Sequence, residues 1–441
     1  MKDVNLKTIK ELKNFIEIVF SNRSVLDQFS LKENSFMRNR KLPFEKLVLL
    51  ITKLCKKTLS IEIEEFFNEF ENSETYSVSS FSQQRIKLNP LFFYYWNQVL
   101  IKSFYAYAQE KVKRWKGYRL IAVDGSNVSL INNQSLRKGF GGQSNQHAFF
   151  VQAKTLYYYD VLNELVVDSI IAPYQVGELS ITYNKTNNLE EDTIAIYDRN
   201  FCNYKMIALH LWQETERKFV IRGNEKHNWV KTFIESGNQE DIVSIKPTNR
   251  IIEGLRQSGF VVNADTAIKV RLIRVELNNG AIEVLITNLL NEEGFKKEEF
   301  KDLYAKRWCV ETNISIQKNI MQLEAFSGLT EVSVKQDFYA TVIVANLHSL
   351  LIKEAQETAQ QQYAHRKYPV KINNNKSFGR IKRVIVELFV CENPEKILEK
   401  LHEKFIREVL PVRKNRSYPR VVKNKQIRSK HKTFTNYKPA F

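Results

Sequence analysis

Apolar residues recur at helical spacing along the first part of the chain. In the first segment they are Leu6, Ile9, Leu12, Phe15, Ile16 and Val19. The stretches PFEKLVLLITKLCKKT and IEIEEFFNEF repeat the pattern further along. Residues that recur every three or four positions share one face of a helix, so the pattern indicates amphipathic helices. We therefore expect residues 1–110 to form an all-helical region.

The pattern changes to strand-like runs near residue 118. β-branched and aromatic residues bounded by turn residues make up YRLIAVDGS, HAFFVQAKTLYYYD, NELVVDSIIAP, DTIAIYDR and RKFVIRG, and such runs predict β-strands. A further β-rich stretch covers about 223–292. Within it Asn278, Asn279 and Gly280 separate two apolar runs, which is a strong signal for a β-hairpin. Helical periodicity returns at about residue 296.

This order of patterns predicts an α/β protein built from three parts. The chain has 441 residues, more than one hydrophobic core usually organises. We place the parts at 1–110, 111–350 and 351–441, with the β-rich stretch at about 223–292 inserted into the second part. The third part is expected to be helical and to end in a basic tail.

The charge of the chain favours a polyanionic partner. Lys and Arg number 67 against 49 Asp and Glu, which gives a net charge of +18 and a pI near 9.5. Nucleic acid is the partner that such a balance suggests. Residues 411–441 contain ten Lys or Arg and no Asp or Glu. We expect this tail to contact nucleic acid or to lie on the DNA-facing surface of the protein, with a merely solubilising tail as the alternative.

The cysteines and the apolar runs bear on the compartment. Cys55, Cys202, Cys309 and Cys391 form no C-x-x-C pair, so neither a zinc knuckle nor a disulfide framework is indicated. Reduced thiols in the cytoplasm fit best. The N-terminal segment lacks the apolar core of a signal peptide, and no run approaches the roughly 18 apolar residues of a membrane span. We expect a cytoplasmic, nucleoid-associated protein without membrane contact.

A short polar helix is expected after the turn-like segment NSETYS. Ser77 is placed to cap a helix in SVSSFSQQRIKLNP that exposes Gln83, Gln84, Arg85 and Lys87. This arrangement suits the reading helix of a helix-turn-helix, with Arg85 and Lys87 as DNA contacts. A solvated polar helix face is an equally good interpretation, because no base-reading code is visible.

Two aspartates follow apolar strand-like runs. Asp124 comes after RLIAV and is expected to end its strand before Gly125, and Asp198 comes after TIAIY. Two acids at the ends of two buried strands could share one cation. Taken singly, each also fits a turn-forming aspartate, whose side chain bonds nearby amides.

A helix expected from Leu303 onward carries a polar stripe that a core face would not have. At about 100° per residue, four side chains fall within a stripe of about 60°: Tyr304, Arg307, Glu311 and Lys318. Such a stripe suits contact with phosphate and with a cation. An exposed, salt-bridged helix face is the alternative.

At these positions the chain resembles the insertion-sequence transposases of the DDE class that carry the YREK signature, Y-x2-R-x3-E-x6-K. All four signature residues stand at the required spacings. The segments IAVDGSNVSL and YDRNFCNY around the two aspartates are similar to family landmarks, and so are LITNLL before the helix and EAFSGLT after it. The likeness covers roughly residues 75–350. The family usually has Arg, Gly and Tyr after its second aspartate, where this chain has Arg199, Asn200 and Phe201.

The resemblance implies a ribonuclease-H-like catalytic core at 111–350 with a β-rich insertion, preceded by a helical DNA-binding domain. It implies that Asp124, Asp198 and Glu311 hold two Mg²⁺ ions, for which Mn²⁺ can substitute. Oxygen ligands suit these hard cations, and ions about 3.5–4 Å apart suit in-line displacement at phosphorus.

The same resemblance implies that Tyr304, Arg307 and Lys318, together with Arg199, contact the DNA backbone. The implied activity is cut-and-paste transposition at terminal inverted repeats of double-stranded DNA by a homodimer. Two other functions stay open. One is a ribonuclease-H-like nuclease without strand transfer, and the other is a non-catalytic DNA-binding protein.

Overall fold

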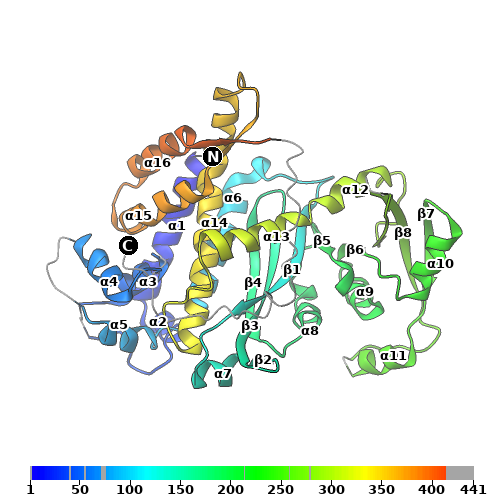
Figure 1. The fold of residues 1–441 in the computed structure, drawn as a ribbon, viewed down its shortest axis with the longest axis horizontal. Coiled ribbons are helices and arrows are strands. Elements are labelled where there is room, and N and C mark those ends of the chain that lie inside the picture. Colours follow the sequence, from blue (N-terminus) through cyan, green and yellow to red (C-terminus); the bar gives the residue numbers. More distant parts are fainter. Residues whose placement is uncertain are drawn as a thin grey trace.

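The computed structural model describes most of the chain. The described residues are 2–38, 41–53, 56–70, 76–212, 214–257, 259–277 and 280–413. A mixed β-sheet runs through the molecule with helices on both faces, and a helical region closes one end (Figure 1). The α/β class expected from the sequence is therefore confirmed. The basic tail predicted at 411–441 lies outside the described residues apart from its first three.

The sheet has the order β2-β3-β1-β5-β6-β9-β8-β7, with β4 paired to β3. Its strands are β1 (Arg119–Ser129), β2 (Gly142–Ser144), β3 (Phe149–Asp160), β4 (Leu165–Pro173), β5 (Thr193–Tyr197), β6 (Lys218–Arg222), β7 (Glu240–Ile245), β8 (Ile268–Glu276) and β9 (Ile282–Thr287). β1 pairs antiparallel with β3 and parallel with β5, and β5 pairs parallel with β6. The sheet is therefore mixed, with three parallel strands at its centre. β10 (Val370–Ile372) and β11 (Val409–Pro411) form a separate small sheet.

Helices make up the rest of the regular structure. They are α1 (Lys2–Ser21), α2 (Arg23–Gln28), α3 (Phe44–Thr52), α4 (Leu59–Asn68), α5 (Val78–Arg85), α6 (Leu91–Ala108), α7 (Gln134–Phe140), α8 (Glu178–Tyr183), α9 (Tyr204–Leu211), α10 (Asn228–Ser236), α11 (Asn249–Arg256), α12 (Glu298–Ala305), α13 (Trp308–Ser315), α14 (Glu331–Gln362), α15 (Asn374–Val390) and α16 (Glu395–Arg407). In the described part of the chain, no helix combines the length and the apolar character needed to cross a bilayer.

The β-rich stretch predicted at about 223–292 continues the central sheet. β9 pairs antiparallel with β6, and β8 and β7 follow outward. The backbone groups of β6 that do not bond to β5 pair with β9. The β-rich stretch therefore extends the central sheet and does not form a separate one. The predicted hairpin is confirmed by the β8–β9 pairing, which reaches Glu276 opposite Ile282. Its turn residues Asn278 and Asn279 lie outside the described residues.

The two faces of the sheet bury different residues. Leu120 and Ala122 of β1 belong to one core, which also contains residues of α13 and α14. Ile121 and Val123 belong to a second core, with residues of α8 and α9. Side chains alternate between faces along a strand, so residue 124 lies on the face covered by α13.

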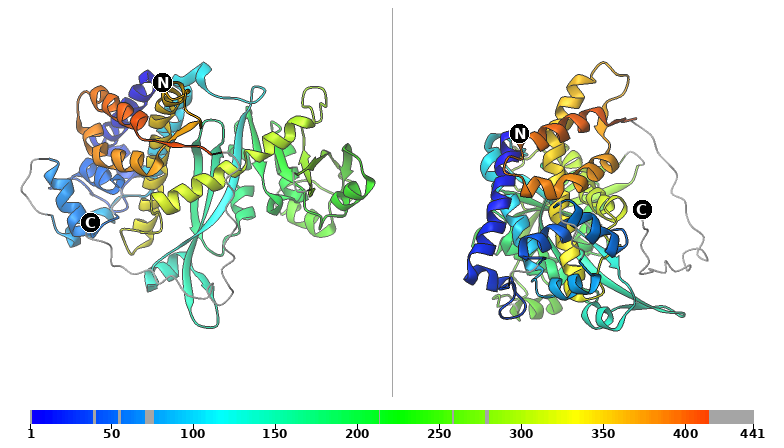
Figure 2. Two further views of the ribbon diagram at one scale, coloured as in Figure 1. Left: turned by 45° about the horizontal axis from the view of Figure 1, so that its top comes forward. Right: turned by 90° about the vertical axis from the view of Figure 1, so that its left-hand side faces the viewer.

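Helices from both ends of the chain share one core. α14 packs against α6 and α16, and α15 packs against α3. Figures 1 and 2 show the orange α15 and α16 beside the blue N-terminal helices. Trp96 of α6 lies 5.2 Å from Phe389 of α15, ring centre to ring centre. α14 runs through residue 350 without interruption. The limits that we placed between the three parts, at 110 and 350, stay a prediction.

Candidate active site

The first two acids lie next to each other on neighbouring parallel strands. The last parallel pair between β1 and β5 joins Ala122 to Ile196. Asp124 and Asp198 each lie two residues beyond that pair, so alternation places both carboxylates on the face that α13 covers. The Asp198 side chain accepts a hydrogen bond of 2.8 Å from the backbone N–H of Asn200 and so caps the turn that follows the strand.

The expectation that β1 ends at Asp124 is wrong. The strand continues to Ser129, and Asp124 pairs with Tyr157 in the long strand β3. β3 extends well past the end of β5, so β1 keeps one antiparallel partner after it has lost the parallel one. Asp124 is therefore paired with β3 on one side, and on the other side its neighbour is the turn that begins with Asp198, where β5 has ended.

Helix α13 brings Glu311 to the same place through Arg307. Nη2 of Arg307 donates to Oε1 of Glu311 over 2.5 Å, and Nη1 lies 3.7 Å from Oδ2 of Asp124. The Arg307 side chain is 8% exposed, against 20% for Asp124 and 35% for Glu311. One nearly buried guanidinium therefore bridges two of the three candidate catalytic carboxylates.

The electrostatics around Asp124 are unbalanced. Burial raises the pKa of Asp124 to about 6, and the charges of Glu311 and Asp198 act in the same direction. Arg307 and the N–H of Gly125 oppose this rise but do not cancel it. Three carboxylates thus share a region in which a single guanidinium supplies the opposing charge closest to Asp124. An added cation would favour the ionised form of Asp124.

The signature helix is not a single regular helix as we predicted. α12 ends at Ala305, α13 begins at Trp308, and a π-helical turn follows at Ile316–Ile320. Between the two helices the Arg307 N–H bonds to the Tyr304 carbonyl at 2.9 Å, a tight 3₁₀-type contact. The tight contact and the π-helical turn both depart from about 100° per residue, so the angles behind the predicted stripe do not apply along the whole segment. Arg307 and Glu311 remain hydrogen-bonded neighbours one turn apart.

Tyr304 is buried beside the acids. It is 7% exposed, and its hydroxyl has no hydrogen-bond partner among the described residues. Burial raises its pKa well above the usual value, and the charges of Arg307, Arg222, Glu283 and Asp198 act on it. Nε of Arg307 likewise has no partner in the described part of the chain. A buried donor without a partner is uncommon in proteins and marks a place where a ligand atom could bind.

Lys318 is tied to β1 just beyond the first aspartate. Its Nζ donates to Oγ of Ser126 and to the carbonyl oxygen of Asn127, both over 2.6 Å. Glu324, in the loop that follows, lies 4.0 Å from Nζ and accepts a bond of 3.0 Å from the N–H of Ser129. Lys318 therefore fixes the strand next to Asp124 in this structure.

Arg199 is exposed directly after Asp198. It lines a cavity of about 370 Å³ with Arg222 and Lys226, between the catalytic strands and the inserted strands. Arg222 pairs with Glu283 at 2.9 Å. Sequence reasoning did not single out Arg222 or Lys226, because neither belongs to a recognisable motif.

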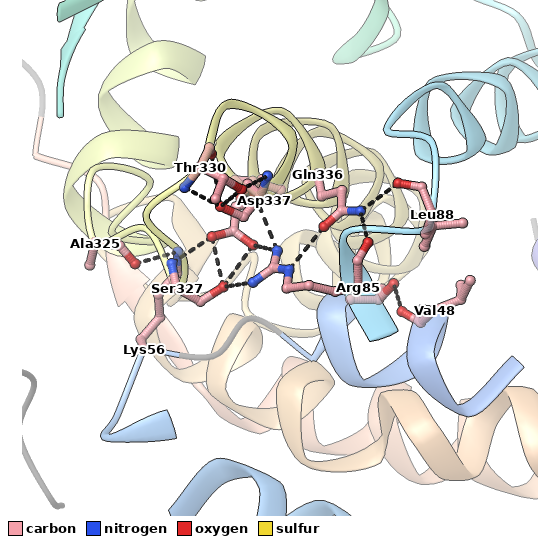
Figure 3. Close-up of polar contacts among 12 residues, drawn as sticks. Val48, Lys56, Arg85, Leu88, Ala325, Ser327, Thr330, Gln336 and Asp337 are labelled. Atoms are coloured by element: carbon pink, nitrogen blue, oxygen red, sulfur yellow. Dashed lines mark hydrogen bonds and ion pairs between the residues drawn. The ribbon is translucent and has the colours of Figure 1, made fainter. Parts of the chain in front are cut away.

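The expected exposure of Gln84 and Arg85 is wrong. Ser77 caps α5 as predicted, accepting a bond of 3.1 Å from the N–H of Ser80. Gln84 and Arg85, however, are only 4% and 2% exposed. The Arg85 guanidinium bonds to Asp337, Gln336 and Ser327, so it is not available to DNA in this conformation (Figure 3). α5 is polar because the side that carries Arg85 packs against buried polar residues of α14.

Lys87 is half-buried and donates to Oε1 of Gln84 over 3.0 Å. It lines an open hollow of about 600 Å³ together with Lys32, Lys41 and Gln83. The lining contains three lysines and no acidic residue. The location of Lys87 is therefore compatible with its predicted contact to DNA, and that contact stays a prediction.

No ready-made metal cluster is present in the described part of the chain, in the sense of three His, Cys, Asp or Glu side chains close enough to hold one ion. The three acids are grouped, and Arg307 lies between Asp124 and Glu311. This geometry brings together acids from two neighbouring strands and a covering helix, inside a span that begins just before β1 and ends within α14. Residues 115–347, the same span and more than half of the chain, match the family model described as Transposase DDE domain.

The chain belongs to the Transposase DDE domain family.

Two further likenesses accompany this transposase family match. The Escherichia coli (strain K12) protein "Transposase InsG for insertion sequence element IS4" is 21% identical over 326 residues, which are 70% of this chain and 69% of that protein. A solved structure, "Cryo-EM structure of piggyBac transposase synaptic complex with hairpin DNA", aligns with a TM-score of 0.40 and 10% identity, over 91% of this chain and 81% of the other. All three candidate acids of this DDE transposase lie inside the matched span. The YREK subgroup stays a prediction.

Proposed function

We propose that this protein catalyses cut-and-paste transposition, with Asp124, Asp198 and Glu311 as the residues that hold two Mg²⁺ ions. The observation that carries the proposal is the grouping of the three acids: Asp124 and Asp198 lie side by side on neighbouring parallel strands, and a buried guanidinium bridges Asp124 to Glu311. The membership of the chain in the transposase family supports it. The mixed sheet, with Asp124 on β1 and Asp198 directly after its parallel neighbour β5, supports a ribonuclease-H-like core.

The residues present suit divalent magnesium or manganese. All three candidate ligands offer carboxylate oxygens, which these hard cations prefer. Burial is the main cause of the raised pKa of Asp124, and the charges of Glu311 and Asp198 add to it, so a cation bound beside these carboxylates would favour the ionised form of Asp124. When bound, the ions would supply the charge that activates the attacking oxygen and stabilises the leaving oxygen. Arg307 would then exchange some of its contacts with the acids for contacts with DNA phosphate.

The other residues of the site are proposed to hold DNA. Tyr304 and Arg307 keep donors without partners at the edge of the acids, and a phosphate oxygen is an acceptor of the right kind. Arg199, Arg222 and Lys226 line the cavity next to Asp198 and would guide a strand toward it. Lys318, by its bonds to β1, would keep the segment that carries Asp124 in place.

The proposed partners follow from the reaction. Transposition joins two ends of a DNA element, so a homodimer that holds one end in each subunit is proposed. The net charge of +18 supports binding to double-stranded DNA. The "insertion sequence element" in the name of the Escherichia coli relative also favours a DNA partner of that kind. A cytoplasmic, nucleoid-associated location is part of the same proposal.

Cleavage of a supercoiled plasmid that carries the two ends of the element tests the proposal. The intact protein is compared with Glu311→Gln in Mg²⁺ and in Mn²⁺. We expect cuts at the ends with the intact protein only, while both proteins bind the DNA equally. Equal cutting by both, or binding without cutting by either, would reject the site. A labelled 3′-hydroxyl end added with an intact target separates a transposase, which joins them, from a nuclease.

A further inference from the structure

A buried polar cluster joins α5 to the loop that leaves the active site. We call it the Arg85 cluster, and it consists of Arg85, Ser327, Ser333, Gln336 and Asp337 (Figure 3). Arg85 donates from Nε to Gln336 at 2.9 Å, from Nη1 to Ser327 at 2.8 Å, and from Nη2 to Asp337 at 2.9 Å. Although burial raises the pKa of Asp337, Arg85 and its other partners hold that pKa below the usual value.

The cluster fixes one end of the loop 321–330. Asp337 accepts from both the N–H and the hydroxyl of Ser327, at 2.5 and 2.8–2.9 Å. Gly328, the residue after Ser327, must be small. A Cβ on Gly328 would lie 2.4 Å from Oγ of Ser333 and 3.3 Å from Nη1 of Arg85. The loop therefore sits directly on the guanidinium, with no room for another side chain.

The other end of the same loop reaches the catalytic strand. Glu324 accepts the N–H of Ser129 at 3.0 Å and lies 4.0 Å from Nζ of Lys318. Lys318 in turn binds β1 at Ser126, two residues beyond Asp124. A chain of direct contacts therefore runs from Arg85 through the loop to the strand that carries the first catalytic aspartate.

We propose that Arg85 is a positioning residue for DNA cleavage, which acts by fixing the loop 321–330 and, through Glu324 and Lys318, the stretch of β1 beside Asp124. The inference rests on the proposed transposase function. It also gives α5 two roles on its two sides. One side lines the hollow with the three lysines, and the other holds the active-site loop. DNA held in that hollow would thus be kept in register with the catalytic acids.

Positioning can be separated from stability at this cluster. Replacing a buried ion pair by apolar residues of similar size often leaves the stability of a protein unchanged or increases it. The double variant Arg85→Met with Asp337→Leu removes both charges of the pair together, so neither partner is left buried without the other. It also removes the groups that bind Ser327. A matched control is Arg271→Met with Glu240→Leu, which removes another buried pair, between β8 and β7.

The first readout is hydrogen exchange of the full-length protein, followed by mass spectrometry. We expect faster exchange in 321–330 and in 126–131 for the Arg85/Asp337 double variant, with α6 unchanged and a thermal midpoint within a few degrees of the wild type. The control pair should change exchange only near β7, near β8 and in residues 289–295, where Arg271 also donates to the carbonyl oxygens of Leu289 and Phe295. Wild-type exchange in both segments of the double variant would overturn the proposal, because the loop would then not depend on Arg85.

The second readout is the single-turnover rate of end cleavage. We expect the double variant to cleave at least about tenfold more slowly with an unchanged Kd for DNA. The reason is that the loop positions Asp124, which acts in the chemical step and not in DNA binding. Arg85→Lys and Glu324→Ala are then compared with the variant that carries both, in a double-mutant cycle. The loss of cleavage rate in the combined variant should be smaller than the two single losses added together, because both residues act through one loop. Full additivity or a wild-type rate would reject the coupling. If the wild type itself does not cleave, the proposed function fails, whereas the exchange data still decide this inference.

Discussion

Arg85 and Arg307 are both almost fully buried, at 2% and 6% exposure, and both lie against an aspartate. The guanidinium of Arg85 uses all three of its nitrogens as hydrogen-bond donors, whereas Nε of Arg307 has no partner among the described residues. The two aspartates also differ. The pKa of Asp337 lies below the usual value, and that of Asp124 is raised to about 6.

The difference separates a completed polar cluster from an incomplete one. Around Arg85 the two charges of the pair face each other and each nitrogen of the guanidinium has an acceptor, so the cluster holds the fold together. Around Arg307 one guanidinium contacts two acids, Asp124 and Glu311, and the charge of Asp198 also acts on Asp124. The Tyr304 hydroxyl is left without a partner in the described part of the chain. Unsatisfied donors and a raised carboxyl pKa are typical of sites that bind a ligand.

The largest expected effect is on catalysis at the incomplete cluster. Asp198→Asn should reduce end cleavage by about a thousandfold or more, as losses of single charge-stabilising groups in active sites do. The fold should persist, because the Asn side chain still offers an oxygen to the N–H of Asn200. Cleavage is measured in single turnover, with DNA affinity measured in parallel.

Asp192→Asn is the matched control for this change. Asp192 lies at the opposite end of β5, where it pairs with Arg114 and Arg119. Its substitution should leave the cleavage rate within a few-fold of the wild type. Equal loss in both variants would show that the effect comes from the sheet and not from the site.

The next effect is on stability at the completed cluster. Asp337→Ala leaves Arg85 buried without its carboxylate and should lower the free energy of unfolding by about 3–5 kcal/mol. Urea denaturation followed by circular dichroism measures the change. Glu235→Ala, which breaks an exposed pair with Lys231, should cost no more than about 0.5 kcal/mol. Comparable losses for the two variants would contradict the structural role of the Arg85 cluster.

A third substitution is expected to raise the free energy of unfolding, and the size of this effect depends on pH. The pKa of Asp124 is higher in the folded protein, so the unfolded chain loses its proton first as the pH rises. The resulting penalty on folding builds up between pH 4 and about 6 and is fully present above pH 6. Asp124→Asn should therefore raise the free energy of unfolding at pH 7 by up to about 3 kcal/mol and abolish cleavage.

Denaturation of the wild type and of Asp124→Asn across this pH range checks the sign. The two should be alike below pH 4 and diverge as the pH rises through 6. Asp337 should behave in the reverse manner. Because its pKa is lowered in the folded protein, its contribution is present above the usual aspartate pKa and is lost as the pH falls further. A constant difference between wild type and Asp124→Asn would refute the unbalanced-charge interpretation.

The smallest effect concerns the buried hydroxyl beside Arg307. Tyr304→Phe should leave the free energy of unfolding unchanged or raise it by about 1 kcal/mol, because no hydrogen bond is lost. Tyr105→Phe removes a bond of 2.7 Å to Asp160 and should lower it by about 1 kcal/mol. If Tyr304→Phe also weakens DNA binding, the hydroxyl contacts DNA. A loss of stability equal to that of Tyr105→Phe would mean that the hydroxyl has a partner within the protein.

Local patterns were enough to find the acids and the strands that carry them. Asp124 and Asp198 follow apolar runs that predict buried strands, and the predicted hairpin is present as the β8–β9 pair. The exact end of β1 could not be predicted, since it depends on the length of β3, its partner across the sheet. The break between α12 and α13 also escaped the sequence, because the residues there all favour a regular helix.

Arg85 shows most clearly why some of the site could not be predicted. The polarity of α5 indicated exposure, but the partners that bury Arg85 lie 242 to 252 residues further along the chain. Asp337 stands just before the largely apolar stretch of α14, and no residue near it in the sequence identifies Arg85 as its partner. Long-range pairing of this kind is set by tertiary packing and not by periodicity.

The shared core of the two chain ends has a consequence for how the protein is made. Phe389 packs on Trp96, and Lys13 donates to the carbonyl oxygen of Cys391 at 3.1 Å. On the ribosome, α1 and α6 therefore emerge long before the helices that cover them. A premature stop ahead of α15 would leave apolar faces exposed and produce an aggregation-prone fragment, not a partly working enzyme. Only a chain that has been translated beyond α15 can complete the core shared by its two ends.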